Sequence, residues 1–257
     1  MLDWLYQFDL VALYPVVVIL VAGASALGHH VGVRYRRDDA HSPDLGTLTG
    51  AALGLLALLL AFSFSIALSR YDARRTMVLE EANAIGSTAN FALMLPAPSQ
   101  PPILSLLRDY TAVRASLGIP FDPPKTRREI AQSLELQARL WQQAIAVTAA
   151  DPQSLPAYRF VASLNEMNNI HERRITALRY HVPIAVTVML LGVALVGVTF
   201  AGYNTGVTGS RRLLPNLIMS VTVAVLVVLV IDLDSPSQGL ITVPNQPLLD
   251  AAQGIPR

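Results

Sequence analysis

The sequence has 257 residues, of which 53% are hydrophobic and 14% charged, and its mean hydropathy is +0.45. A soluble domain carries about a quarter charged residues, so this composition excludes an ordinary soluble globular protein and indicates an integral membrane protein. The formal net charge of +1 predicts no general affinity for nucleic acid. The chain has no cysteine, which excludes disulfides and cysteine-based catalysis or metal binding.

The first predicted membrane span covers residues 10–28, an apolar run without charge that is long enough to cross a bilayer with little tilt. Residues 1–10, MLDWLYQFDL, include two aspartates and neither lysine nor arginine. We therefore expect no cleavable signal peptide, because such a peptide begins with a positively charged region.

The central feature of the sequence is the stretch 47–95, in which an apolar run passes directly into a charged amphipathic one. Residues 48–68 contain neither charge nor proline, and at 1.5 Å per residue they span roughly 31 Å, the thickness of the hydrocarbon core of a bilayer. Residues 55–85 contain no glycine or proline, so nothing local breaks the helix. We predict one long helix whose first part, residues 47–69, is the second membrane span and whose second part enters a soluble domain.

Two rows of side chains run along this second span. One row has small residues every three or four positions, which suits close packing against neighbouring helices in lipid: Gly50, Gly54, Ala57 and Ala61. The other row is bulky and includes Leu58, Phe62 and Ile66, with the polar Ser63 and Ser65 beside it. The bulky row either faces lipid tails or, in a ring of subunits, forms a hydrophobic constriction.

Residues 70–181 form the predicted soluble domain, a bundle of four amphipathic helices. The long helix enters it with an apolar face made of Val78, Ala82, Ile85 and Ala89. The second helix has the apolar face Ile103, Leu106, Leu107, Tyr110, Val113 and Leu117. The third opens with a capping box at Thr126 and Glu129 and is predicted to bury Ile130, Leu134, Trp141 and Ile145. The fourth follows an N-cap at Ser154 and is predicted to bury Leu164, Met167, His171, Ile175 and Leu178.

The third and fourth spans are predicted at residues 182–203 and 213–231, and the tail, residues 233–257, is rich in proline, glycine and glutamine and predicted to be irregular. The fold class is therefore an all-α membrane protein with a soluble bundle inserted between the second and third spans. Both termini and the bundle then lie on one side of the membrane. The positive charges hardly distinguish the two sides, since the membrane-proximal ends of the bundle hold six arginines, at 70, 74, 75, 173, 174 and 179, and the two short loops hold five: Arg34, Arg36, Arg37, Arg211 and Arg212.

The charged residues of the bundle suggest a metal site at first sight. However, Glu166 and His171 are five residues apart, whereas di-metal bundles place glutamate and histidine three apart. We therefore predict that His171 is a hydrogen-bonded core residue and that ion pairs near the membrane join Arg70, Arg74 and Arg75 to Glu80, Glu81 and Glu166. His29, His30 and His41 have no carboxylate at ligand spacing. No nucleotide-binding loop, catalytic triad or redox motif is present, so we expect no enzyme, metal or cofactor.

Several segments resemble a known family of membrane proteins. Leu59, Leu60, Ala61 and Phe62, followed by Ala67 and Arg70, are similar to the second span of bestrophins, although Ser63, Phe64 and Ser65 stand where bestrophins have Arg-x-Asn. The segments RYDARR (70–75), EEANAIG (80–86), LNEMNNIHERR (164–174) and DLDSPSQGLITV (232–243) extend the resemblance to the bacterial bestrophin-like family. It covers most of the chain from residue 50. It implies a homo-oligomer, as a pentamer, in the bacterial inner membrane, with the second span innermost and the helical domain cytoplasmic.

Two function classes remain after these observations. The resemblance implies an ion channel whose neck is lined by Leu58, Phe62 and Ile66, with Ser63 and Ser65 as its polar groups. The ion selectivity of such a channel cannot be read from an apolar neck. The alternative is a non-conducting scaffold or signalling protein that acts through the soluble bundle. An enzyme of lipid or envelope metabolism is a third and weaker class, since no carboxylates or histidines cluster in the spans. The expected partners are the lipid bilayer, further copies of the chain and inorganic ions.

Overall fold

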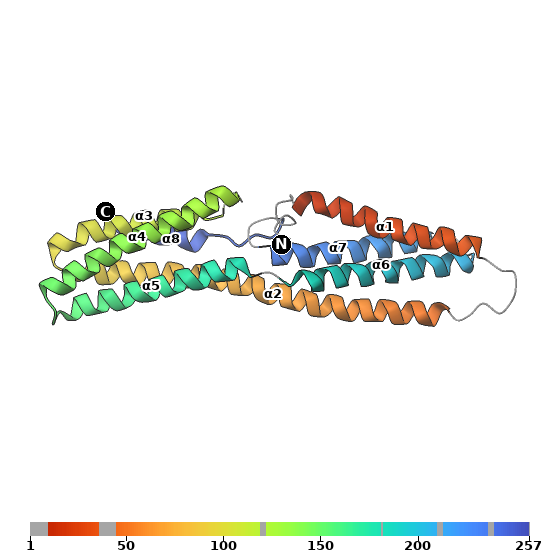
Figure 1. The fold of residues 1–257 in the computed structure, drawn as a ribbon, viewed down its shortest axis with the longest axis horizontal. Coiled ribbons are helices and arrows are strands. Elements are labelled where there is room, and N and C mark those ends of the chain that lie inside the picture. Colours follow the sequence, from red (N-terminus) through yellow and green to blue (C-terminus); the bar gives the residue numbers. More distant parts are fainter. Residues whose placement is uncertain are drawn as a thin grey trace. The chain divides into compact units, whose positions relative to one another are not determined.

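The computed structural model describes residues 10–35, 45–118, 122–180, 182–209, 213–235 and 239–256. Regular structure in this part of the chain is helical throughout (Figure 1). The elements are α1 (Leu10–Arg34), α2 (Leu45–Ala92), the short 3-10 helix η2 (Ala97–Ser99), α3 (Gln100–Ser116), α4 (Pro123–Ala150), α5 (Leu155–Arg179), α6 (Ile184–Val207), α7 (Leu213–Asp234) and α8 (Gln246–Gly254). The chain divides into two compact units, Met1–Arg70 with His181–Thr242 (the membrane unit) and Tyr71–Tyr180 with Val243–Arg257 (the helical unit).

Four segments of the described chain are long and apolar enough to cross a membrane: Ala12–Arg34, Gly46–Ala92, Leu155–Val207, which holds both α5 and α6, and Leu214–Asp234. They overlap the four spans that the sequence predicts. The prediction of one long central helix is also confirmed, because α2 is a single helix of 48 residues. It belongs to both units. Of the arginines compared above, Arg36, Arg37, Arg211 and Arg212 lie outside the described residues, as does His41.

Helices α1 and α6 of the membrane unit pack closely because glycine faces backbone at each contact. A Cβ atom on Gly28 would lie 2.2 Å from the carbonyl oxygen of Thr199, and one on Gly202 would lie 2.0 Å from that of Ser25. Gly32 and Gly206 make equally tight approaches one turn further on, so each helix carries a Gly-x-x-x-Gly motif. Without a hydrophobic driving force in lipid, such backbone contact is a main source of helix association. Neither motif is among the sequence-based predictions above.

The side of α2 that is buried in the membrane unit is neither of the two predicted rows. It consists of Thr49, Leu56, Ser63 and Ala67, spaced by seven, seven and four residues. The small row lies on another side of the helix and is exposed in the single chain: Gly50, Gly54, Ala57 and Ala61. A Cβ atom on Gly50 or Gly54 would meet nothing within 4 Å. Among the described residues, nothing packs against the two glycines of this row.

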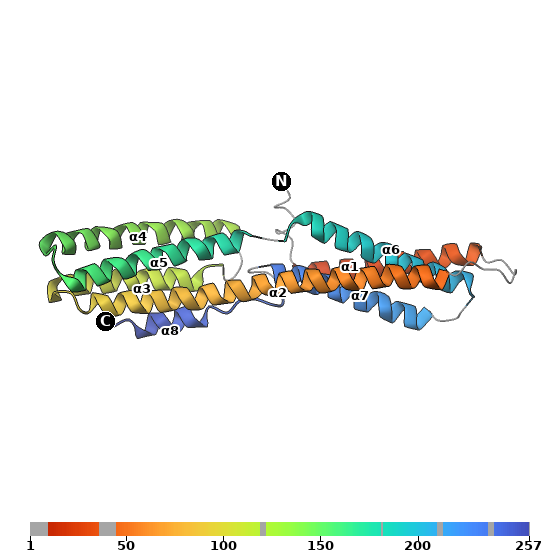
Figure 2. The same ribbon diagram turned by 90° about the horizontal axis from the view of Figure 1, so that it is seen from below.

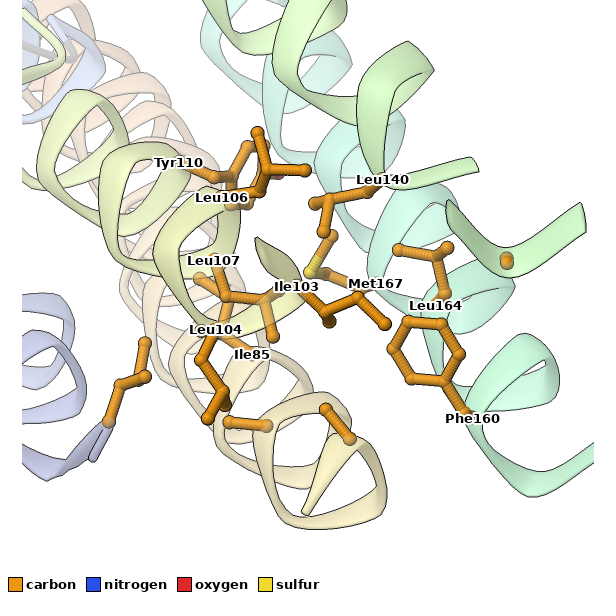
Figure 3. Close-up of a cluster of buried hydrophobic side chains, with 14 of the residues drawn as sticks. Ile85, Ile103, Leu104, Leu106, Leu107, Tyr110, Leu140, Phe160, Leu164 and Met167 are labelled. Atoms are coloured by element: carbon orange, nitrogen blue, oxygen red, sulfur yellow. The ribbon is translucent and has the colours of Figure 1, made fainter. Parts of the chain in front are cut away.

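The helical unit contains the second part of α2 with η2, α3, α4, α5 and α8 (Figure 2). Its core is built from the apolar faces of these helices, and Figure 3 shows Ile103 and Leu107 of α3 facing Leu140 of α4 and Met167 of α5. These four side chains have no exposed surface. Burying one such side chain stabilises the fold by about 1.5–3 kcal/mol.

The predicted faces of this unit are confirmed for three of the four helices. The predicted residues of the α2 extension are all buried, and α3 and α5 bury most of theirs, with Val113 and Leu178 half-buried. Ser154 is the N-cap of α5 as predicted, since its side chain accepts a hydrogen bond from the amide of Ala157.

The prediction for α4 is wrong in both its start and its face. The helix begins at Pro123 after Asp122, three residues before the expected cap, and the Glu129 carboxylate binds the Ser116 hydroxyl and the Gly118 amide instead. The buried side is Glu129, Ser133, Leu136, Gln137, Leu140, Ala144 and Val147. The predicted Leu134, Trp141 and Ile145 are exposed, with Ile130 half-buried. An apolar stripe that is free of charge is not necessarily the one that packs within the chain.

The tail differs from the irregular segment expected over 233–257, because it contains α8. Leu248 of this helix has no exposed surface and Ile255 just after it is 4% exposed, so both belong to the core of the helical unit. The Arg108 guanidinium of α3 donates a hydrogen bond to the carbonyl oxygen of Pro256. Leu248 and Ile255 in the core, with Ala251 packed against it, stabilise a short helix that propensity alone does not predict.

Candidate functional site

The bulky row on α2 is exposed at each of the three predicted neck positions. The exposed fractions are 53% for Leu58, 61% for Phe62 and 46% for Ile66, while Leu56 on the buried side has 2%. Three large apolar side chains thus project from one side of the helix, each one turn after the last. In the single chain these three side chains are not part of a hydrophobic core.

The two serines assigned to the neck separate in the structure. Ser65 is exposed beside the bulky row, whereas Ser63 is only 5% exposed and lies on the side of α2 that packs inside the membrane unit. A side chain buried within its own subunit does not face a pore. We therefore remove Ser63 from the predicted neck and keep Ser65.

A groove of about 530 Å³ runs between α2 and α7 in the membrane unit. Its wall on α2 includes Ala57 and Ala61 of the small row together with Phe64, and its wall on α7 includes Val223 and Leu226. The lining is apolar, and the small side chains of alanine leave the space open. Part of the small row thus borders a groove able to accept apolar groups.

The strongest polar feature of the helical unit is a buried charge network centred on Glu81 of α2. Its Oε1 accepts a hydrogen bond of 2.6 Å from Nε of Arg114, and its Oε2 accepts one of 3.3 Å from Nη2 of the same residue. Arg174 of α5 also donates to Oε2 through Nη1. The Glu81 and Arg114 side chains have no exposed surface, and that of Arg174 has 5%. One carboxylate therefore joins three helices through two guanidinium groups.

Neutral side chains complete this network. The Tyr110 hydroxyl donates to Oε1 of Glu81 at 3.2 Å, accepts from Nε2 of Gln137 at 3.3 Å and lies 3.1 Å from Nδ1 of His171. Since Tyr110 gives its proton to the carboxylate, Nδ1 of His171 donates to the phenol oxygen. Asn245 of the tail accepts from Nη2 of Arg174 at 3.1 Å and donates to the carbonyl oxygen of Ala115 at 2.9 Å. The tail is thereby tied to α3 and α5.

The electrostatics of the network follow from burial and from its charges. Burial alone would raise the pKa of Glu81, but the guanidinium groups of Arg114 and Arg174 outweigh it and hold that pKa below its usual value. Burial lowers the pKa of His171 to about 4, and the positive charge of Arg114 adds to the effect. Burial, together with the Glu81 charge, raises the pKa of Tyr110. At neutral pH the network thus holds an ionised glutamate, two arginines, a neutral histidine and a neutral tyrosine.

The predicted polar residues only partly come together. Glu81 and His171 share the network, and His171 is a hydrogen-bonded core residue as predicted. Glu166 instead pairs with Arg173 at 2.6 Å on the surface, where both side chains are about half exposed, and with Glu80 it lines a polar groove between α2 and α5. Arg74 is buried, Arg70 is half-buried and Arg75 is exposed.

Sequence reasoning missed Arg114 and Arg174, which carry the network. Each lies on an apolar helical face, Arg114 four residues after Tyr110 and Arg174 seven residues after Met167. An arginine within the apolar stripe of a helix is rarely buried unless it is paired, so its position in that stripe could have indicated a buried ion pair. No group of three or more histidine or acidic side chains able to hold a metal ion occurs in the described chain.

Comparison with known proteins decides the family. The model of the bestrophin-like domain matches residues 16–248, which is most of the chain. The chain belongs to the bestrophin-like family. No curated protein matches it.

Solved structures of a bacterial bestrophin homologue from Klebsiella pneumoniae share the fold. A single-site mutant of that protein is 16% identical over 93% of this chain and 97% of its own, with a TM-score of 0.73. A second mutant is 15% identical over 96% and 97%, again with a TM-score of 0.73, and the structure phased with zinc is 15% identical over 93% and 96%, with a TM-score of 0.71. At such identity the likeness establishes the bestrophin fold. Together with the four candidate spans, it makes this bestrophin-like chain an integral membrane protein.

Proposed function

We propose that this bestrophin-like chain forms a homo-oligomeric ion channel, as a pentamer, with α2 nearest the axis and Leu58, Phe62 and Ile66 forming its hydrophobic neck. The observation that carries the proposal is the exposure of these three side chains on one side of the longest helix. A ring of such side chains excludes hydrated ions until it widens, because an ion that enters it loses water without gaining a polar partner.

The oligomer is supported by the rest of the surface of α2. The small row and the adjoining α2–α7 groove have no partner in the single chain, and helices of neighbouring subunits approach closely along such rows. In this arrangement the small row packs between subunits and the bulky row points to the axis.

The membrane topology is part of the same proposal. The helical unit is a soluble domain inserted between the second and third spans, and it lies in the cytoplasm of a bacterium with the four spans in the inner membrane. The ion pair of Arg173 with Glu166 at the surface of α5 supports a location in water, as does the partly exposed pair of Lys125 with Glu129 on α4. No catalytic role is assigned to it.

The neck is tested by recording single channels from purified protein in planar bilayers. Phe62→Ala combined with Ile66→Ala should increase the conductance or hold the channel open, since both changes widen the proposed ring. Val188→Ala combined with Met189→Ala is the matched control, because these α6 side chains are about as exposed as the neck residues, at 62% and 57%. The control should keep the wild-type conductance.

A non-conducting scaffold is the alternative outcome of this experiment. It gives no current from wild type or from either double variant when insertion into the bilayer is verified. That result would replace the channel with a scaffold acting through the helical unit.

A further inference from the structure

The buried network of the helical unit contains more positive than negative charge. Among the described side chains that its hydrogen bonds join, Arg114 and Arg174 are cationic, Glu81 is anionic, and Tyr110, Gln137, Asn245 and a neutral His171 complete it. Its net charge is therefore +1. Both arginines and the glutamate are more than nine-tenths buried. An excess charge at such depth is costly unless a counter-ion is present, because the interior solvates it poorly.

One guanidinium nitrogen of the network has no hydrogen-bond acceptor in the described part of the chain. Nε and Nη2 of Arg114 both bind the Glu81 carboxylate, whereas Nη1 of the same guanidinium is buried and binds no acceptor among the described residues. Arg174 differs, because its Nη1 binds Glu81 and its Nη2 binds Asn245. The N–H groups of Arg114 Nη1 are thus buried donors without an acceptor among the described residues. Native proteins leave few buried donors without a partner, and a bound ion or water is the usual explanation.

The nearest backbone does not replace the missing acceptor. Arg114 lies in the last turn of α3, where the helix dipole supplies roughly half a negative elementary charge. This partial charge lowers the cost of the excess without accepting a hydrogen bond from Nη1. A water molecule accepts that hydrogen bond but leaves the charge uncompensated. A small anion does both.

We propose that Arg114 Nη1 binds a small inorganic anion of the halide class inside the helical unit. The anion is a structural counter-ion to the pair of arginines that Glu81 shares. It is separate from any ion passing the neck, because Arg114, Glu81 and Arg174 all belong to the helical unit and the neck residues to the membrane unit. The proposal does not depend on conduction.

The first test is thermal unfolding of the full-length protein in detergent. The midpoint is measured in sodium chloride, sodium bromide and sodium gluconate at the same ionic strength. We expect the two halides to raise the midpoint by about 5 °C relative to gluconate, since a ligand that binds only the folded state stabilises it. Equal midpoints in halide and gluconate would overturn the proposal.

Three variants separate the site from general salt effects. Arg114→Gln makes the network neutral and should abolish the halide effect. Glu81→Gln raises the net charge to +2, so the midpoint should be lower in gluconate and the halide effect larger. Arg173→Gln is the matched control, because it also removes one arginine, but from an ion pair at the surface. The Arg173 side chain is 51% exposed, and this variant should respond to halide like wild type. A halide effect that persists in Arg114→Gln would show that the ion binds elsewhere.

If Arg114→Gln does not fold, the proposal is tested by measuring the equilibrium binding of radioactive chloride to wild type and to Arg173→Gln. One ion per chain is expected in both proteins, beyond any ions bound along a pore. Where Arg114→Gln folds, it should bind one ion fewer per chain. No bound chloride in wild type would mean that water alone occupies Arg114 Nη1.

Discussion

At the scale of single residues, the buried network shows how one carboxylate positions several cations. Glu81 loses its hydration on folding, and only the hydrogen bonds from Arg114, Arg174 and Tyr110 compensate for that loss. Removing one partner of such a group typically costs 3–5 kcal/mol, because the other charge stays buried without compensation. The network therefore specifies how α2, α3 and α5 pack more sharply than apolar contacts alone would.

The burial of His171 predicts that the stability of this unit depends on pH. Its pKa is about 4 in the folded protein and about 6.5 when unfolded, so the unfolded chain binds a proton that the folded chain does not as pH falls through this window. Folding stability should therefore be complete above pH 6.5 and fall by about 3 kcal/mol by pH 4. Nε2 is buried without a partner among the described residues, which agrees with a neutral ring.

The measurement is the thermal midpoint at pH 7.5, 5.5 and 4.5 for wild type and His171→Gln. The variant keeps a neutral polar side chain and should lose most of the dependence between pH 6.5 and 4.5. An unchanged slope in the variant would assign the pH dependence to other groups.

At the scale of secondary-structure elements, glycine determines which helices meet in the membrane unit. Helices α1 and α6 approach so closely that the carbonyl oxygens of Ser25 and His29 stand where Cβ atoms of Gly202 and Gly206 would be. A Cβ atom on Gly50, Gly54 or Gly86 of α2, or on Gly192 of α6, would meet nothing within 4 Å, and one on Gly197 of α6 would meet only the side chains of Leu53 and Leu56, at ordinary contact distances of 3.5 and 3.7 Å. Close approach is thus a property of the pair of helices and not of glycine itself.

Gly202→Ala should destabilise the membrane unit, because its Cβ would lie 2.0 Å from a backbone oxygen and the two helices would have to separate. We expect a loss of about 1–3 kcal/mol, measured as a lower thermal midpoint in detergent. Gly192→Ala on the same helix is the control, since its Cβ meets nothing within 4 Å. It should be neutral or slightly stabilising, because alanine favours helix. Equal effects of the two changes would contradict the packing argument.

At the scale of the whole molecule, the exposed apolar surface points to association. Soluble surfaces rarely carry large contiguous apolar patches without a partner. On α4, Leu134, Trp141 and Ile145 are exposed and lie along one side of the helix, away from the core of their own unit. With the proposed oligomer, this stripe becomes a contact between subunits.

Leu134→Ser combined with Ile145→Ser should weaken the oligomer while leaving the helical content unchanged, since neither side chain belongs to the core of its own chain. Mass measurement in mild detergent should give five chains for wild type and smaller species for the variant. Leu155→Ser is the control at an exposed apolar position on another helix, 64% exposed at the start of α5. A variant that keeps the wild-type mass would place the subunit contacts elsewhere.

The sequence by itself determined the long helices, though not the start of α4 or the short α8, because length, charge and period are local properties. Charge-free runs of about 20 residues mark the spans, and the absence of glycine and proline over 55–85 predicts an unbroken α2. The tertiary structure decided what those properties leave open. On α4 two stripes were apolar enough to be buried, and only packing selected the one with Leu136 and Leu140.

The tertiary structure also decided which side chains distant in sequence come into contact. Glu81 was recognised as a charge that needs a partner, but its partners are 33 and 93 residues away, and no local spacing relates them. Ser63 and Ser65 are two positions apart on one helix, yet one is buried and the other exposed, because neighbouring helices cover only one side of α2. Burial depends on which elements meet, and that is a property of the folded chain.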